Sequence, residues 1–297
     1  MIGQSSPTTG RRYPVALICR AFGVPRSSLY ASTAPSNGGP AVSPRKRGPK
    51  TTINDETLAA AIREAIASSP FHGEGHRKVR SMLGERAVRV GRNRVLRVMR
   101  ENGLLAPTRS RRHHGDPAHS GSITTDRPDK MWGTDGTRFY TERDGWCWFF
   151  GAIDHGTCEI VGWKTAKRGD RWAALEPIHE GVRYAFGGFG KDIARGLTVR
   201  SDWGPQYTSH AFGGDLAWLG IRHSPSYVGE PQCNGVIERF MRTLKEQCLW
   251  IHRFETIEEA TAAIRDFIER YNEQWMIERH GHRSPRQVRA DMLAEAA

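Results

Sequence analysis

The sequence contains little cysteine and no long hydrophobic run. Its five cysteines are odd in number and include no Cys-x-x-Cys pair, which argues against a disulfide framework and against a thiolate zinc site. No apolar stretch reaches the roughly 20 residues that a membrane-spanning helix needs, and the N-terminus lacks the apolar segment of a secretion signal. We therefore expect no membrane partner and a cytoplasmic location, on the nucleoid if the chain binds DNA.

Acidic residues are scarce in the first 130 positions. Residues 1–130 hold 23 Lys and Arg against nine Asp and Glu, whereas residues 131–297 hold 21 against 23. A concentrated positive field attracts polyanions through the release of counterions, although an arginine-rich helix can also be an ordinary solvated surface. The asymmetry predicts that the first part binds nucleic acid and that the second part has another task.

Residues 1–34 are expected to form a helix-turn-helix-like segment. Leu17 and Phe22 belong to one apolar helical face, Gly23 interrupts it, and a second short helix follows. This order is typical of helix-turn-helix motifs, but helical hairpins without DNA-binding function share it.

A linker rich in Ser, Pro and Gly follows at residues 35–52. It ends in the basic residues Arg45, Lys46 and Arg47. A flexible basic segment of this kind is expected to contact phosphates without reading bases.

Residues 53–106 are expected to form a helical DNA-binding module. Asn54 is a suitable N-cap for its first helix, and two further helices are expected within 75–104. The last helix carries four arginines opposite its apolar stripe: Arg92, Arg94, Arg97 and Arg100. An arginine-rich face of this kind fits a helix that lies against or in a DNA groove; the alternative is a solvated basic surface. Residues 107–130 are expected to form a second basic linker.

Residues 131–250 have the pattern of an α/β catalytic core. Strands are expected at 131–141, 146–154, 159–164, 197–199 and 221–224, and helices at 170–186, 208–219 and 235–250. Three consecutive strands followed by alternating strands and helices predict a mixed five-stranded sheet with flanking helices. Residues 251–297 are expected to form a C-terminal helical segment.

Three carboxylates in this core, Asp135, Asp202 and Glu238, occupy informative places. Asp135 lies in the first expected strand, Asp202 follows the fourth, and Glu238 lies on the last helix. Pairing of the first and fourth strands would bring the two aspartates to one edge of the sheet, where a helix packed across it could add Glu238. Such oxygen ligands suit hard divalent cations, which cut and join phosphodiesters in pairs. Each acid alone is more simply an ordinary surface carboxylate, and only the combination favours a site.

Two basic residues share a helical face with Glu238. Arg242 and Lys245 follow it at i+4 and i+7, and we expect both to contact DNA phosphates.

Four other residues near the acids have open or secondary roles. Gln206 and Asn234 are expected to be polar neighbours of the site. Trp203 either stacks on a distorted base or packs in the core, with neither favoured. Asp154, at the end of the second strand, is interpreted as a turn residue.

Three motifs carry a resemblance to a known family. They are Trp-x-x-Asp at 132–135, Ser-Asp-x-Gly-x-Gln-Tyr at 201–207, and Asn-Gly-x-x-Glu-Arg-Phe-x-x-x-Leu-Lys at 234–245. The chain resembles the DDE integrase and transposase superfamily, whose core is ribonuclease-H-like and retroviral-integrase-like. Within it, the chain is similar to the downstream reading-frame product of a two-frame insertion-sequence transposase.

The resemblance implies both a reaction and its cofactor. Asp135, Asp202 and Glu238 would be the catalytic triad and would bind two Mg²⁺ ions, with Mn²⁺ able to substitute. The reaction would be cleavage of transposon ends and 3′-OH strand transfer into DNA. The implied partners are double-stranded DNA, as terminal inverted repeats and target, other copies of the chain in a homo-oligomer on DNA, and a fused or separate upstream-frame DNA-binding protein.

Two other functions would use the same features. A catalytically inactive DNA-binding regulator of transposition would need the helical modules but has no need of three intact acids. A ribonuclease-H-like nuclease would cut without strand transfer. An assay with labelled transposon ends and Mg²⁺ distinguishes the three functions. A transposase gives joined strands, a nuclease gives nicks only, and an inactive regulator gives no product.

Overall fold

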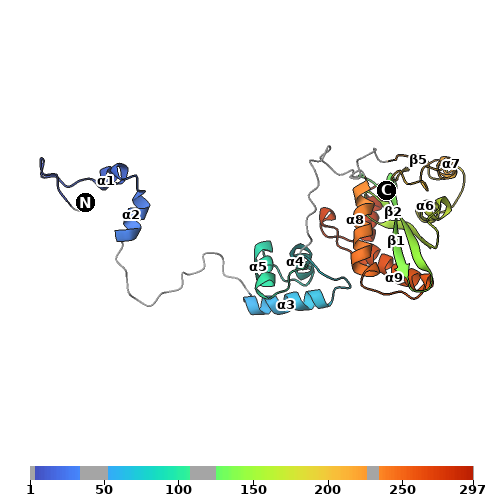
Figure 1. Ribbon diagram of the computed structural model, residues 1–297, viewed down its shortest axis with the longest axis horizontal. Coiled ribbons are helices and arrows are strands. Elements are labelled where there is room, and N and C mark those ends of the chain that lie inside the picture. The colour runs from blue at the N-terminus through green and yellow to red at the C-terminus, as the bar shows by residue number, and fades with distance from the viewer. Residues whose placement is uncertain (1–3, 34–52, 108–124, 226–233, 297) are drawn as a thin grey trace. The chain divides into compact units, whose positions relative to one another are not determined.

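The computed structural model describes residues 4–33, 53–107, 125–225 and 234–296 (Figure 1). The chain divides into two compact units, Met1–Thr52 and Ile53–Ala297. The predicted basic linker with Arg45, Lys46 and Arg47 lies outside the described residues, as does most of the second predicted linker. Within the described residues, no helix combines the length and the apolar character needed to cross a membrane.

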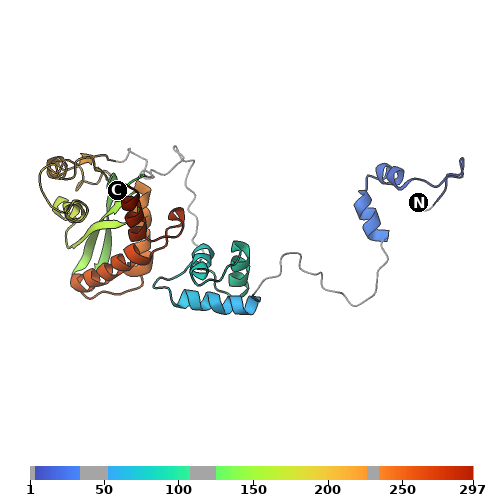
Figure 2. The same ribbon diagram turned by 180° about the vertical axis from the view of Figure 1, so that it is seen from behind.

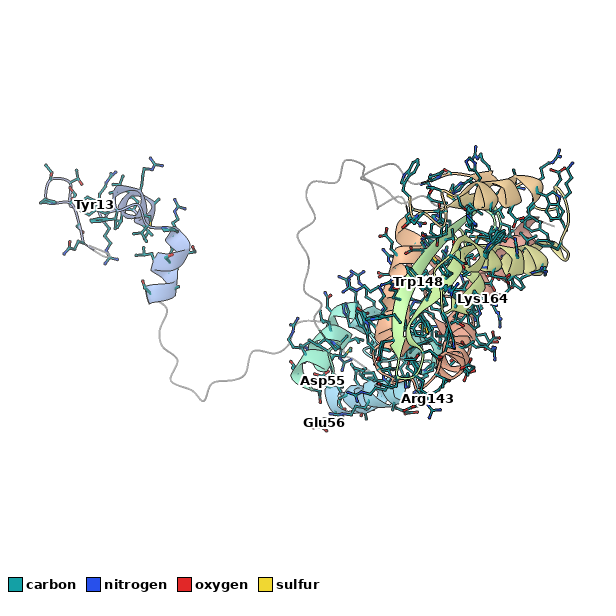
Figure 3. All side chains as sticks on the ribbon, turned by 45° about the vertical axis from the view of Figure 1, so that its right-hand side comes forward. Tyr13, Asp55, Glu56, Arg143, Trp148 and Lys164 are labelled. Atoms are coloured by element: carbon teal, nitrogen blue, oxygen red, sulfur yellow. The ribbon has the colours of Figure 1, made fainter. Side chains whose placement is uncertain are left out.

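The first unit contains the two short helices that the sequence predicts. They are α1 (Val15–Ala21) and α2 (Arg26–Thr33). The turn between them includes Gly23 with a φ of +64°, a conformation that glycine adopts without steric cost. Tyr13, labelled in Figure 3, and Phe22 are exposed, and Cys19 is the one buried hydrophobic residue among the described residues of this unit. The pair therefore has little hydrophobic core of its own.

A three-helix module begins the second unit. It consists of α3 (Asp55–Ala67), α4 (His76–Glu85) and α5 (Arg92–Glu101). The Asn54 side chain accepts a hydrogen bond from the Thr57 amide at 2.7 Å, so it caps α3 as expected. Figure 3 labels Asp55 and Glu56 in the first turn of this helix. The apolar stripes of the three helices meet in one buried cluster: Leu58, Ala59, Ile62, Ala65, Val79, Leu83, Val95, Val98 and Met99.

A mixed five-stranded sheet forms the centre of the second unit, as predicted. Its strands are β1 (Met131–Thr141), β2 (Gly145–Asp154), β3 (Ile160–Ala166), β4 (Thr198–Arg200) and β5 (Arg222–His223). Their order is β3-β2-β1-β4-β5. The first three strands are antiparallel, whereas β4 is parallel to both β1 and β5. The first strand therefore lies beside the fourth, which the expected site requires.

Helices cover both faces of the sheet (Figures 1 and 2). One face packs against α6 (Arg171–Phe186) and α7 (His210–Trp218). The opposite face packs against α8 (Gly235–Leu244) and α9 (Ile257–Gln274). Two apolar clusters thus fill the space on either side of the strands, in the ribonuclease-H-like arrangement.

The end of α8 differs from the expected continuous helix over 235–250. From Lys245 to Leu249 the backbone is π-helical (η2), and the chain turns at Trp250. A π-helical turn widens the helix locally and reorients the side chains on it. Lys245 and Gln247 therefore lie on a segment whose geometry a periodicity of 3.6 residues does not describe.

The C-terminal segment ends with a short 3₁₀ turn, η3 (Glu278–His280), and α10 (Pro285–Ala296). Arg289 in α10 forms ion pairs with Asp129 and with Glu159, at 3.5 Å for the latter. Glu159 is 1% exposed and lies between β2 and β3. The last helix is therefore tied to the core by a buried charge network.

Candidate active site

Asp135 lies on the side of β1 that faces α8. Side chains alternate along a strand, so Asp135 shares its side with Gly133 and Phe139. Phe139 packs in the same apolar cluster as Ile237 and Phe240 of α8. The carboxylate of Asp135 thus points toward the helix that carries Glu238.

Asp202 reaches the same edge of the sheet from β4. Gly133 pairs with Arg200 in the parallel register of β1 and β4. Asp135 and Asp202 each lie two residues beyond this last pair, Asp135 within β1 and Asp202 just after the end of β4, so both stand at the same end of the two strands. The Asp202 carboxylate also accepts a hydrogen bond from the Gly204 amide at 2.9 Å, which fixes the bend after the strand.

Glu238 lies in the first turn of α8, where the helix dipole favours negative charge. The start of this helix is tied to β1 by Asn234, which is 4% exposed. Its Nδ2 atom donates a hydrogen bond to the carbonyl oxygen of Thr134 at 3.1 Å. The helix that carries Glu238 is therefore anchored at the residue immediately before Asp135.

The charges at this edge act on one another. The pKa of Asp135 is raised to about 7, mainly by burial and also by the negative charges of Asp202 and Glu238, while the Gly136 amide and Lys245 oppose the rise. Partial burial also raises the pKa of Glu238. The three acids and Lys245 therefore share one electrostatic environment.

The three acids do not form a closed metal-binding cluster. In the parts of the chain that the structure describes, no three His, Cys, Asp or Glu side chains lie close enough together to hold a metal ion. Repulsion between like charges opposes a closer approach of the carboxylates. The donors are all carboxylate oxygens, however, and this chemistry suits Mg²⁺.

Tyr207 is a neighbour of the acids that the sequence interpretation did not single out. Its side chain is 1% exposed. Burial raises its pKa well above the usual range, and the charges of Asp135 and Asp202 raise it further. The one signal in the sequence was that Tyr207 ends the motif that contains Asp202, five residues after that acid.

A cavity of about 510 Å³ is lined by residues of the loop that follows Asp202. Trp203 and Tyr207 line it from the Asp202 loop, and His223 lines it from β5. Trp203 is 54% exposed, so its ring is accessible from solvent. This exposure argues against a core-packing role for Trp203, while base stacking stays a prediction.

The structure gives different surroundings to the six described residues that were expected to contact DNA. Arg92 and Arg100 are exposed on α5. Arg94 and Arg97 each form an ion pair with Asp55 at 2.8 Å, so they link α5 to α3.

The two basic residues that follow Glu238 also differ from each other. Arg242 forms an ion pair with Glu246 at 2.9 Å along the helix. The positive charge of Lys245 instead lowers the pKa of Asp135. Contact of any of the six with DNA stays a prediction.

Asp154 serves a turn, as predicted. Its Oδ1 atom accepts hydrogen bonds from the amide and the hydroxyl of Thr157 at 2.7 and 3.0 Å. Its Oδ2 atom accepts one from the Asp129 amide at 2.9 Å. These three hydrogen bonds hold the Asp154 carboxylate within the turn after β2.

Known protein families match most of the described second unit. Two family models described as "Integrase core domain" match residues 125–231 and 219–285. A third, described as "HTH-like domain", matches residues 53–112. The match to the HTH-like domain therefore covers the three-helix module, and the helix-turn-helix-like character of residues 1–34 stays a prediction.

Individual relatives are proteins of bacterial insertion elements. The chain is 28% identical to an uncharacterized 31 kDa protein of insertion element IS600 from Shigella sonnei, over 90% of this chain and 96% of that protein. It is 32% identical to the transposase of IS904 from Lactococcus lactis subsp. lactis (strain IL1403), over 48% of this chain and 54% of the relative. Transposase InsD of IS2D from Escherichia coli (strain K12) is 23% identical over 93% of this chain and 91% of the relative.

Among solved structures, the catalytic core domain of BIV integrase is 19% identical with a TM-score of 0.42, covering 57% of this chain and 98% of that chain.

The integrase core matches together span residues 125–285, more than half of the chain. The HTH-like match precedes them in sequence, and full-length relatives come from insertion elements. The chain therefore belongs to the insertion-sequence transposases with a retroviral-integrase-like core.

Proposed function

We propose that this transposase cuts and joins DNA at Asp135, Asp202 and Glu238. One observation carries the proposal: the charges of Asp202 and Glu238 both act on the half-buried Asp135. Three acids from β1, from the end of β4 and from α8 would thus contribute to one site, although they are far apart in the sequence. Accumulated negative charge of this kind is costly without a cation and is typical of sites that hold one.

The cofactor that fits these donors is Mg²⁺, with Mn²⁺ as a substitute. Asp135, Asp202 and Glu238 would hold two ions, consistent with their oxygen-only donor set. When bound, such a pair supplies an activated oxygen nucleophile and stabilises the leaving oxygen of the phosphodiester.

Basic residues around the acids would bind and orient the DNA strand. Lys245 lowers the pKa of Asp135, so its positive charge is effective at the site. A phosphate near the carboxylates would otherwise be repelled by them, and an ammonium group offsets that repulsion. Arg242 lies one turn from Glu238 and would extend the contact along the strand.

The substrate is proposed to be double-stranded DNA. The exposed Arg92 and Arg100 of the three-helix module would contact the terminal inverted repeats, with Arg45, Lys46 and Arg47 on phosphates. Cleavage at the ends would be followed by 3′-OH transfer into target DNA. Assembly as a homo-oligomer on DNA, and cooperation with an upstream-frame DNA-binding protein, belong to the same proposal.

The test replaces Asp135 with Asn, which keeps the shape but removes the negative charge. The Asp135→Asn variant is expected to lose cleavage of labelled transposon ends in Mg²⁺ by a factor of at least about 1,000, with DNA binding unchanged. Asp266→Asn, at an exposed position of α9, is the matched control and should cleave normally.

The products identify the reaction class. Joined strands support the transposase reaction, whereas nicks without joined strands indicate a nuclease. Continued cleavage by Asp135→Asn would contradict the assignment of this carboxylate.

A further inference from the structure

The loop between α3 and α4 contacts the catalytic core through aromatic and cationic side chains. Phe71, which is 6% exposed, lies edge-on to Trp275 at 4.8 Å between ring centroids and belongs to the apolar cluster under α8 and α9. The Lys78 ammonium of α4 lies 3.2 Å from the centroid of the Trp275 ring. A cation over an indole face is the most favourable cation–π arrangement.

A side-chain amide joins the same loop to η2. The His72 amide donates to Oε1 of Gln247 at 2.8 Å, and Nε2 of Gln247 donates to the His72 carbonyl oxygen at 2.9 Å. Both backbone groups of one residue are therefore satisfied by one side chain. Such two-point pairing fixes orientation as well as distance.

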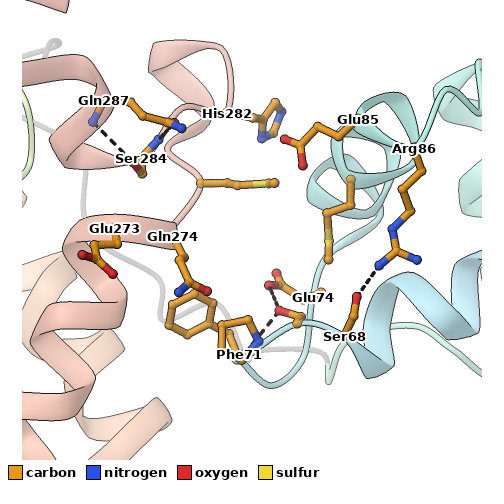
Figure 4. A pocket seen from close by; sticks show the side chains of 14 residues that line it. Ser68, Phe71, Glu74, Glu85, Arg86, Glu273, Gln274, His282, Ser284 and Gln287 are labelled. Atoms are coloured by element: carbon orange, nitrogen blue, oxygen red, sulfur yellow. Dashed lines mark hydrogen bonds between the residues drawn. The ribbon is translucent and has the colours of Figure 1, made fainter. Parts of the chain in front are cut away.

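Next to these contacts is a cavity of about 310 Å³ (Figure 4). Phe71, Glu74 and Arg86 line it from the three-helix module, and Gln274 and His282 line it from the C-terminal segment. The junction is thus held by a few specific contacts beside open space, rather than by a continuous apolar interface.

We propose that Phe71, His72, Lys78, Gln247 and Trp275, here called the latch, position the three-helix module against the catalytic core for cleavage. The proposal rests on the proposed function and deepens it. The segment η2 links the three-helix module to the acids. Its Gln247 side chain hydrogen-bonds the module at His72, and the positive charge of Lys245, two residues earlier, lowers the pKa of Asp135. The latch residues are positioning residues that do not touch the reacting atoms.

A fixed module has a measurable consequence for the reaction. The distance between the DNA sequence bound by the module and the three acids would then be fixed. The chain would therefore cut at a fixed number of base pairs from the bound sequence. Restricting the arrangement of bound DNA and reactive groups also raises the rate. Loss of the latch should therefore spread the cut positions and slow cleavage without weakening DNA binding.

The experiment uses the full chain with Lys78→Ala and Gln247→Ala combined. Hydrogen exchange measures the latch directly, because the His72 amide loses its acceptor in this variant and should exchange about tenfold faster or more. Single-turnover cleavage of a labelled end in Mg²⁺ should fall about tenfold or more, with cuts at several positions. The DNA dissociation constant should stay within about twofold.

Matched controls separate the latch from general damage. Gln274→Ala at the same junction and Lys164→Ala on the sheet remove the same residue types and should leave exchange, rate and cut position unchanged. Lys78→Arg in a chain that keeps Gln247 should retain a single cut position, because a guanidinium also lies well on an indole ring.

Three results would overturn the proposal. They are unchanged His72 exchange in the double variant, unchanged cleavage despite faster exchange, or a loss of DNA affinity as large as the loss of cleavage. If the parent chain itself does not cut, the proposed function fails, and His72 exchange still reports separately whether these contacts exist in solution.

Discussion

At the residue scale, Asp135 is the acid of the site whose ionised form is most disfavoured by its surroundings. Its pKa is raised from 3.8 to about 7, mainly by burial and then by Asp202 and Glu238. The folded chain therefore holds this proton more tightly than the unfolded chain does. Its contribution makes the folded state less stable as pH rises from about 4 to about 7, and the cost is complete above that range.

Asparagine at this position should remove that cost. The Asp135→Asn variant is expected to unfold at a higher temperature than the parent at pH 8 without divalent cations, and at a similar temperature at pH 4. Added Mg²⁺ should stabilise the parent more at pH 8 than at pH 6, because binding requires the ionised carboxylate. Thermal unfolding at these pH values measures both effects, and an equal difference between the two chains at every pH would contradict this account.

Asn234 is expected to act as a positioning residue for Glu238. Asn234→Ala removes the hydrogen bond to Thr134 and should lower the cleavage rate about 10- to 100-fold with unchanged DNA affinity, since α8 loses its anchor beside Asp135. Asn234→Asp keeps the shape but cannot donate, so it should be at least as impaired. Single-turnover rates and DNA binding measure the effect; normal cleavage by the aspartate variant would show that the donated hydrogen bond is unimportant.

The three acids could be proposed from the sequence because each lies in a motif with a clear place in the strand order. Partners brought together by folding were harder to infer. The sequence shows the charge of Arg94 and Arg97, from which DNA contact is predicted, but it does not show that both side chains pair with Asp55. The hydroxyl of Tyr207 became relevant only when its burial beside Asp135 and Asp202 was known.

At the element scale, the strands were predictable from alternation and from the turn residues between them. β1 follows the predicted range 131–141 and β2 differs from its prediction by one residue at the start. Periodicity could not show that the helix after Asn234 becomes π-helical at Lys245, because a repeat of 3.6 residues describes a regular α-helix and carries no signal for a wider turn.

The last helix is expected to contribute to stability through Arg289. This side chain pairs with Asp129 and with the buried Glu159, whose pKa burial raises. Arg289→Ala leaves a buried carboxylate without its main partner and should lower the free energy of unfolding by about 3–5 kcal/mol. The more exposed Arg283, which pairs with Asp291, is the matched control, and Arg283→Ala should cost about 1 kcal/mol or less. Denaturant unfolding measures both, and equal losses would contradict the role of burial.

At the scale of the whole molecule, charge is distributed unevenly along the chain. The integrase core carries the acids, while the excess of positive charge lies in residues 1–130. Sequence composition shows this distribution of charge, but it gives no sign of the latch contacts. Lys78 and Trp275 lie in different parts of the sequence, and nothing local to either residue indicates the other.

The unit Met1–Thr52 should add affinity for DNA without setting the cut position. Residues 1–52 contain eight Lys and Arg and no Asp or Glu. Their removal should weaken DNA binding and reduce the slope of log affinity against log salt, because each phosphate contact adds about 0.9 to that slope. The latch lies wholly in Ile53–Ala297, which is a compact unit, so this shorter chain should still cut at one position.

Titration of binding at several salt concentrations and mapping of the cut measure the two expectations separately. Replacing Arg45, Lys46 and Arg47 with serine in the full chain is the intermediate case, and it should lower the slope by up to about 3. An unchanged slope in the shorter chain would mean that the first unit does not contact DNA. Scattered cuts with an intact latch would mean instead that the first unit, and not only the three-helix module, sets the distance from the bound sequence to Asp135.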